Sequence, residues 1–169
     1  MRYTTHLVTS LAVALPILEA TNTTSLLTIG AVSLGALLPD IDEPNSFIGR
    51  RTRGISDLLN KMLGHRGATH SLLGIGVFAV LVTPFVFFLN MPFPVALALV
   101  GGYFLHILGD SFSKSGVAWF LPFKKRKYKS GFGIIYYKTG SMAETAVFFV
   151  FSALVGYMIF MYDIPLMII

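Results

Sequence analysis

The sequence predicts an all-α membrane protein: a bundle of about five transmembrane helices with a short amphipathic interfacial helix and a small β-hairpin. Of its 169 residues, 54% are hydrophobic and only 12% are charged, whereas soluble domains carry about 25% charged residues. The hydrophobic residues gather in five runs, and the Lys and Arg residues gather between those runs. No repeat or linker divides the chain, so we expect a single domain over residues 1–169.

The first two runs, residues 3–19 and 25–38, are short for membrane spans. A span across a hydrocarbon core of about 30 Å needs about 20 residues. We therefore expect thinning of the membrane, or extension of the helix ends into the interface. The second run is rich in small residues, which let helices approach closely in lipid; these are Gly30, Ala31, Ser33, Gly35 and Ala36.

A polar segment, residues 43–67, follows the second run and contains the predicted interfacial helix. Its apolar residues recur at helical spacing, which is typical of an amphipathic helix lying on a membrane; they are Ile55, Leu58, Leu59, Met62 and Leu63. Its basic residues are Arg50, Arg51, Arg53 and Lys61.

The remaining predicted spans cover about residues 68–89, 94–111 and 142–161. Pro84 is expected to kink the third span, and a turn at residues 90–92 joins it to the fourth. Between the fourth and fifth spans, the runs 117–123 and 132–137 are predicted to pair as the hairpin, with Gly131 near its turn.

Threading these five spans places the polar residues at one membrane face. All four histidines and four of the eight acids lie at span ends on that face: His6, Asp40, Asp42, His65, His70, His106, Asp110 and Glu144. The opposite face receives only Glu19 and Asp163 among the charged residues. All 13 Lys and Arg residues fall on the crowded face, which the charge-bias rule assigns to the cytoplasm. We therefore expect an integral inner-membrane protein with a cytoplasmic N-terminus and a C-terminus outside. The pI of about 9.6 is then explained by the Lys and Arg residues that accumulate in cytoplasmic loops.

The segment 64–71 places His65, Arg66, His70 and two hydroxyl residues directly before the third span. Ionisable groups at a membrane boundary are costly and indicate function. Residues five apart in a helix point about 140° apart, so His65 and His70 are expected to converge from a turn and from a helix start. Arg66 suits bidentate binding of a phosphate or carboxylate. Thr69 and Ser71 cap the helix or orient ligands, and capping is the more common role.

Two further motifs carry carboxylates. Asp40 and Asp42 follow Pro39 at a helix end, where a cation would offset the negative end of the helix dipole; in isolation a solvated turn is the more common reading. His106 and Asp110 share one helix face, which suits two ligands of one metal, a carboxylate orienting a ligating histidine, or a simple hydrogen-bonded pair.

The joint placement of these groups favours a metal site. The chain contains four histidines and no cysteine, so thiolate ligation is excluded, and mixed imidazole and carboxylate ligands suit zinc first, with manganese or iron as alternatives. The candidate ligands are His6, Asp40, Asp42, His65, His70, His106 and Asp110, which exceeds the need of one ion and allows one or two. The candidate catalytic residues are Asp42, His65, Arg66 and Asp110. Glu144 suits capping of the fifth span instead.

The basic run Lys124–Lys129 predicts contact with anionic lipid headgroups, at about 1 kcal/mol per charge. Nucleic-acid binding is not expected, because the only aromatic side chains near the run on which nucleobases could stack are Tyr128, Tyr136 and Tyr137.

Four motifs in order carry a family resemblance: Leu38-Pro39-Asp40-Ile41-Asp42, Pro44-x-Ser46-Phe47-x-Gly49, Gly64-His65-Arg66-Gly67-x-Thr69-His70-Ser71 and His106-Ile107-Leu108-x-Asp110. With His6, they make the chain similar to the YdjM-like integral membrane proteins, described as membrane-bound metal-dependent hydrolases. The resemblance ends near residue 123 and does not include Glu144. Where the family has Thr-Pro-Ala-Gly after the last aspartate, this chain has Ser113-Lys114-Ser115-Gly116, which leaves the role of the threonine hydroxyl to Ser113.

The first functional hypothesis is a metal-dependent hydrolase at the cytoplasmic membrane surface, cleaving a phosphoester or acyl bond of a lipid or lipid-linked substrate. The alternative is a non-catalytic, metal-stabilised membrane scaffold or binding protein, whose ion would be saturated by protein ligands. Ion transport ranks last, because it requires polar groups near mid-membrane. The sequence carries no indication of the oligomeric state.

Overall fold

The computed structural model describes residues 1–63, 67–129, 137–162 and 164. These residues form six α-helices and three short 3-10 helices, with no strand among them, so the all-α prediction is confirmed. The elements are α1 (Tyr3–Ala20), α2 (Leu26–Gly35), η1 (Leu38–Asp42), η2 (Gly49–Arg51), α3 (Arg53–Leu63), η3 (Ala68–His70), α4 (Leu72–Phe88), α5 (Phe93–Ser111) and α6 (Met142–Met161).

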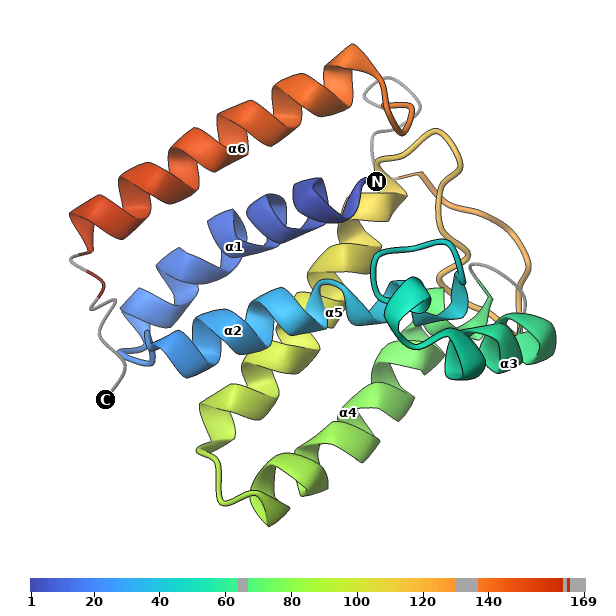
Figure 1. Cartoon of the computed structure of the whole chain (residues 1–169), viewed down its shortest axis with the longest axis horizontal. Coiled ribbons are helices and arrows are strands. Elements are labelled where there is room, and N and C mark those ends of the chain that lie inside the picture. The colour runs from blue at the N-terminus through green and yellow to red at the C-terminus, as the bar shows by residue number, and fades with distance from the viewer. Residues whose placement is uncertain (64–66, 130–136, 163, 165–169) are drawn as a thin grey trace.

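The long helices run back and forth between two ends of the bundle (Figure 1). The short turns joining α1 to α2 and α4 to α5 lie at one end, together with the C-terminus. The N-terminus, α3 and the long connections gather at the other end, which we call the loop end. The helices therefore alternate between the two ends in the order that the sequence predicts.

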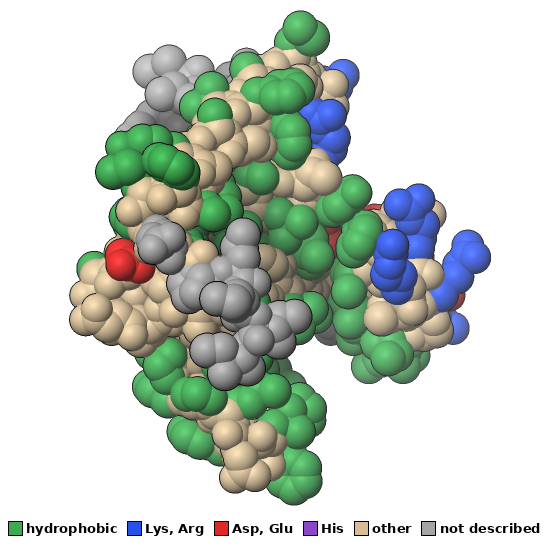
Figure 2. Space-filling view, turned by 60° about the vertical axis from the view of Figure 1, so that its left-hand side comes forward, with side chains coloured by type: hydrophobic (Ala, Val, Ile, Leu, Met, Phe, Trp, Pro, Cys, Tyr) green, Lys and Arg blue, Asp and Glu red, His purple; other side chains and the backbone are tan. Residues whose placement is uncertain are grey.

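The predicted five-span bundle is only partly supported. Within the described residues, α5 and α6 are long and apolar enough to cross a membrane, and α4 is apolar but shorter. Helix α2 is shorter than its predicted run because the 3-10 turn η1 begins at Leu38, just before Pro39. Many large hydrophobic side chains are nevertheless exposed on the helices. On the face shown in Figure 2 they lie apart from the Lys and Arg side chains, which gather on one side.

The predicted interfacial helix forms as α3, which keeps an apolar face exposed. The exposed fractions are 58% for Ile55, 57% for Leu58 and 70% for Met62.

The predicted hairpin is not confirmed. Val117 pairs with Tyr128 in an isolated antiparallel bridge, and Ser113 pairs with Tyr137 in a parallel one. Residues 130–136, which include most of the predicted second strand, lie outside the described residues. The end of the basic segment Lys124–Lys129 lies beside Val117, and the ring of Tyr128 packs edge-on against Phe120 with 5.5 Å between the ring centroids.

Candidate metal centre

Close packing of α2 against α5 brings the parts of the site together. A Cβ atom on Gly35 would lie 2.1 Å from the carbonyl oxygen of Leu99, and one on Gly102 would lie 2.2 Å from that of Val32. Only glycine therefore allows the two backbones to touch at these positions. Their contact brings the Ala36 carbonyl oxygen within 2.7 Å of His106 Nδ1.

This hydrogen bond determines how His106 can act. A carbonyl oxygen only accepts, so Nδ1 must carry the proton, and Nε2 is left with a lone pair. Nε2 is buried and makes no hydrogen bond within the described residues. A ligating histidine typically has this arrangement, with one nitrogen held by the backbone and the other directed at the ion.

Helix η1 brings Asp40 toward His106 and His70. Asp40 Oδ1 lies 3.6 Å from His106 Nε2 and 3.5 Å from His70 Nε2. Both distances are too long for hydrogen bonds. Two atoms that each ligate a tetrahedral zinc ion at about 2.1 Å lie about 3.4 Å apart. The three residues form a cluster whose ligand atoms fit a single ion, and the buried, unpartnered His70 Nε2 supports this fit.

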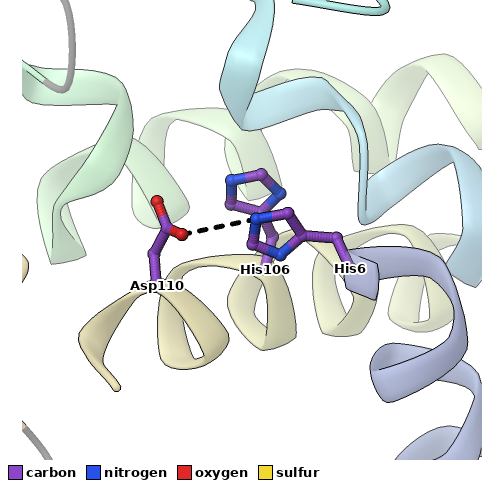
Figure 3. Close-up of side chains that lie close together, drawn as sticks. All are labelled: His6, His106 and Asp110. Carbon is purple, nitrogen blue, oxygen red and sulfur yellow. Dashed lines mark ion pairs between the residues drawn. The ribbon is translucent and has the colours of Figure 1, made fainter. Parts of the chain in front are cut away.

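A second cluster consists of His6, His106 and Asp110 (Figure 3). The His6 ring stacks on the His106 ring with 3.6 Å between centroids and 9° between planes. His6 Nε2 lies 3.4 Å from Asp110 Oδ1, which also accepts a 2.9 Å hydrogen bond from the Met1 ammonium. Two buried imidazolium cations in such contact would repel each other strongly, so the stacked pair favours neutral rings, as metal ligation requires.

The two clusters share His106, whose only available ligand atom is Nε2. One ion bound by His106 therefore belongs to one cluster at a time, and a second ion would depend on His6 and Asp110. The His70 and His106 ring centroids lie 5.3 Å apart, close enough for a common ion.

Asp42 and Thr69 orient His70. Thr69 Oγ1 donates to Asp42 Oδ2 and lies 3.1 Å from His70 Nδ1. Asp42 Oδ2 itself lies 3.6 Å from that nitrogen. Thr69 thus serves ligand orientation, whereas Ser71 caps α4 by accepting a 3.1 Å hydrogen bond from the Gly74 N–H.

Two supporting residues were not predicted from the sequence. The Tyr103 hydroxyl donates to the Thr69 carbonyl oxygen at 2.8 Å, and Asn60 Nδ2 donates to the Asp42 carbonyl oxygen at 2.7 Å. Tyr103 lies one helical turn before His106, so its position on the same face of α5 was the available signal. Asn60 had no comparable signal, because its contact depends on how α3 folds back onto η1.

The charges of η1 and η3 stabilise each other. Burial alone would raise the pKa of Asp40, but the nearby imidazoles of His106 and His70 hold that pKa well below its usual range. Burial alone would lower the pKa of His70, but the adjacent carboxylates of Asp40 and Asp42 raise it to about 9. Without a bound metal ion, a protonated His70 therefore supplies the positive charge that offsets the carboxylates of Asp40 and Asp42.

Glu144 belongs to neither cluster. Glu144 accepts hydrogen bonds from the Arg2 and Gly140 backbone N–H groups, the latter at 2.6 Å, and so ties the start of α6 to the N-terminus. His65 and Arg66 lie outside the described residues.

Comparison with known proteins gives a family match over almost the whole chain. The model of the YdjM inner membrane protein family matches residues 1–164. Inner membrane protein YdjM of Escherichia coli (strain K12) is 46% identical over 99 residues, which cover 55% of this chain and 48% of the relative. The Shigella flexneri protein of the same name matches to the same extent.

A third relative, Uncharacterized protein YvsG of Bacillus subtilis (strain 168), is 30% identical over 115 residues, covering 68% of this chain and 67% of the relative. The match to the two YdjM relatives spans about half of their length. No solved structure matches the chain.

Proposed function

Since this chain belongs to the YdjM family of inner membrane proteins, we propose that it is a membrane-embedded, metal-dependent hydrolase. The observation that carries the proposal is the buried cluster of Asp40, His70 and His106, with ligand atoms at the spacing of a single coordination sphere. A divalent ion, zinc first, would supply Lewis acidity that polarises a substrate oxygen and lowers the pKa of water to about 7.

The residues around this cluster have distinct roles in the proposal. The Asp40 side chain is 20% exposed, whereas those of His70 and His106 are at most 1% exposed, so substrate approaches from the Asp40 side. Asp110, which lies 3.4 Å from His6, would accept the proton of the attacking water. Asp42, which Thr69 holds, keeps His70 oriented. His65 and Arg66 stay candidates from the sequence alone, Arg66 for an anionic substrate group.

The position of the cluster supports a lipid substrate. The elements that carry it are η1, η3 and the last turns of α5, which lie at the loop end with α3, and the long helices expose many hydrophobic side chains. We therefore propose a phosphoester or acyl bond of a lipid or lipid-linked substrate, with the loop end cytoplasmic. The Lys124–Lys129 segment is proposed to contact anionic headgroups.

Elemental analysis of the purified protein tests the metal. We expect at least one zinc, manganese or iron ion per chain, and loss of that ion in the His70→Ala/His106→Ala double variant. Asp57→Asn is the matched control, because Asp57 is an exposed acid on α3 outside the clusters. Asp40→Asn, which preserves side-chain volume, provides a second variant should the double variant fail to fold.

Retention of metal in both the double variant and Asp40→Asn would overturn the proposal. Phosphate or fatty-acid release from a panel of lipids, with zinc or manganese added, tests hydrolysis. Bound metal with no release from any lipid in the panel would favour the non-catalytic scaffold instead.

A further inference from the structure

An apolar groove of about 430 Å³ runs beside the metal centre, between α3, α4 and α5. Its walls include Leu59 of α3, Ile41 of η1, and Leu73 and Val77 of α4. Pockets of this size commonly hold small organic ligands. The α4 wall is open to the outside, since Leu73 is 43% exposed and Val77 is 51% exposed.

One end of the groove is part of the wall of the metal centre. Thr69 lines the groove and also hydrogen-bonds Asp42 and contacts His70. Tyr103 lines it as well, and its hydroxyl is turned away to the Thr69 carbonyl oxygen. Ile41, the neighbour of both Asp40 and Asp42, completes this end. A molecule lying in the groove would therefore have its apolar part against α4 and its polar part next to the carboxylates and imidazoles.

The α3 wall of the groove has the residue pattern of a helix that lies on a membrane surface. Beyond Leu59 it exposes Ile55, Leu58 and Met62, and its exposed basic residues, Arg53 and Lys61, suit an anionic headgroup. The Asn60 hydrogen bond to the Asp42 carbonyl oxygen keeps this wall in place against η1.

We propose that this groove binds one acyl chain of an anionic membrane phospholipid, with the headgroup held at the Asp40, His70 and His106 cluster. The inference rests on the proposed function, because the groove identifies a substrate only if the cluster hydrolyses it. It narrows that function to a lipid whose scissile bond lies near the headgroup, within reach of Asp40, rather than along the acyl chain.

Photo-crosslinking tests the groove independently of activity. The protein is reconstituted in nanodiscs with phosphatidylglycerol carrying a diazirine on one acyl chain, irradiated, digested and analysed by mass spectrometry. We expect labelling concentrated on Leu59, Leu73 and Val77. The Val77→Trp variant should fill the groove and reduce labelling there about tenfold, equivalent to about 1.4 kcal/mol. Val150→Trp is the matched control, because Val150 is an equally apolar, 65% exposed residue on α6.

The position of the headgroup is tested with diazirine-labelled diacylglycerol, which lacks the phosphate and should label the groove more weakly. Uniform labelling over all exposed helices, or labelling centred on the separate groove at Val13 and Leu105, would overturn the proposal. Equal labelling by both lipids would overturn the headgroup assignment.

Metal content distinguishes failure of the acyl-chain proposal from failure of the hydrolase proposal, because Val77→Trp should retain its metal. Groove labelling in a protein that binds no metal would overturn the hydrolase and the substrate assignment while leaving the acyl-chain site.

Discussion

His106 is the residue on which the proposed metal centre depends. It is completely buried, the Ala36 carbonyl oxygen fixes its tautomer, His6 stacks on its ring, and its remaining nitrogen faces Asp40. Each of these contacts restricts the ring, so the ligand atom is already oriented before an ion binds.

Thr69→Val should weaken metal binding without removing a ligand. The substitution keeps the shape of the side chain but removes the hydroxyl that donates to Asp42 and contacts His70. Loss of such a supporting contact typically lowers metal affinity about 10- to 100-fold. Competition with a chelating dye measures this change. Thr21→Val, at the opposite end of the bundle, should have no effect, and unchanged affinity in Thr69→Val would contradict the assigned role.

Metal binding should strengthen as pH rises toward about 9. The raised pKa of His70 means that folding stability gained from its protonated form is fully present below its ordinary pKa of about 6.5 and is lost as pH rises through about 9. Ligation requires the neutral ring, so binding must release this proton, and affinity should increase up to about tenfold per pH unit in that window. Isothermal titration calorimetry in buffers of different ionisation enthalpy counts the released protons. An affinity independent of pH would argue against His70 as a ligand.

The decisive contact between elements is that of α2 with α5. Helix α2 has 10 residues, which span about 15 Å, so η1 begins alongside α5 instead of beyond it. The Gly35 and Gly102 contacts hold this arrangement. Together they place Asp40 beside His106 and bury Asp42, whereas the sequence taken alone favoured a solvated turn for these two carboxylates.

Gly102→Ala should damage both the fold and the metal centre. Its Cβ would lie 2.2 Å from the Val32 carbonyl oxygen, so the helices must separate, at a cost of about 1–3 kcal/mol. We expect a lower thermal unfolding temperature and weaker zinc binding. Gly101→Ala is the control next to it, because a Cβ there meets no atom within 4 Å. Equal stability of the two variants would show that the close helix contact is unimportant.

At the scale of the whole molecule, the chain separates its polar groups from its apolar surface. All described histidines and the acids near them lie at the loop end, and the opposite end consists of short turns. This polarity matches a protein held in a membrane with its chemistry on one side, as the family assignment to inner membrane proteins also indicates.

The orientation in the membrane can be tested with single cysteines, because the chain has none. With the loop end cytoplasmic, Asp57→Cys on α3 should resist a membrane-impermeant maleimide in intact cells. Glu19→Cys, near the opposite end of α1, should react. Both should react after the cells are permeabilised. The reverse pattern in intact cells would show that the loop end faces outward.

The sequence by itself determined the helices and the face that the polar residues share. Apolar runs, prolines and turn residues located each of the five long helices to within a few residues, as at Met142–Met161, because local hydrophobicity and backbone preference act within a single segment. Counting those helices was then enough to bring His6, Asp40, His70, His106 and Asp110 to one end of the bundle.

Only the tertiary structure decided which of these residues meet. The stacking of His6 on His106, the hydrogen bond from His106 to Ala36 and the contact of Asn60 with Asp42 join residues far apart in the chain. The bridge from Val117 to Tyr128 is likewise set by the packing of an aromatic ring, not by the local pattern. Such contacts depend on differences of an ångström in how helices approach. Gly35 was among the small residues noted in the second run, but its counterpart Gly102 is recognisable only when both helices are seen together.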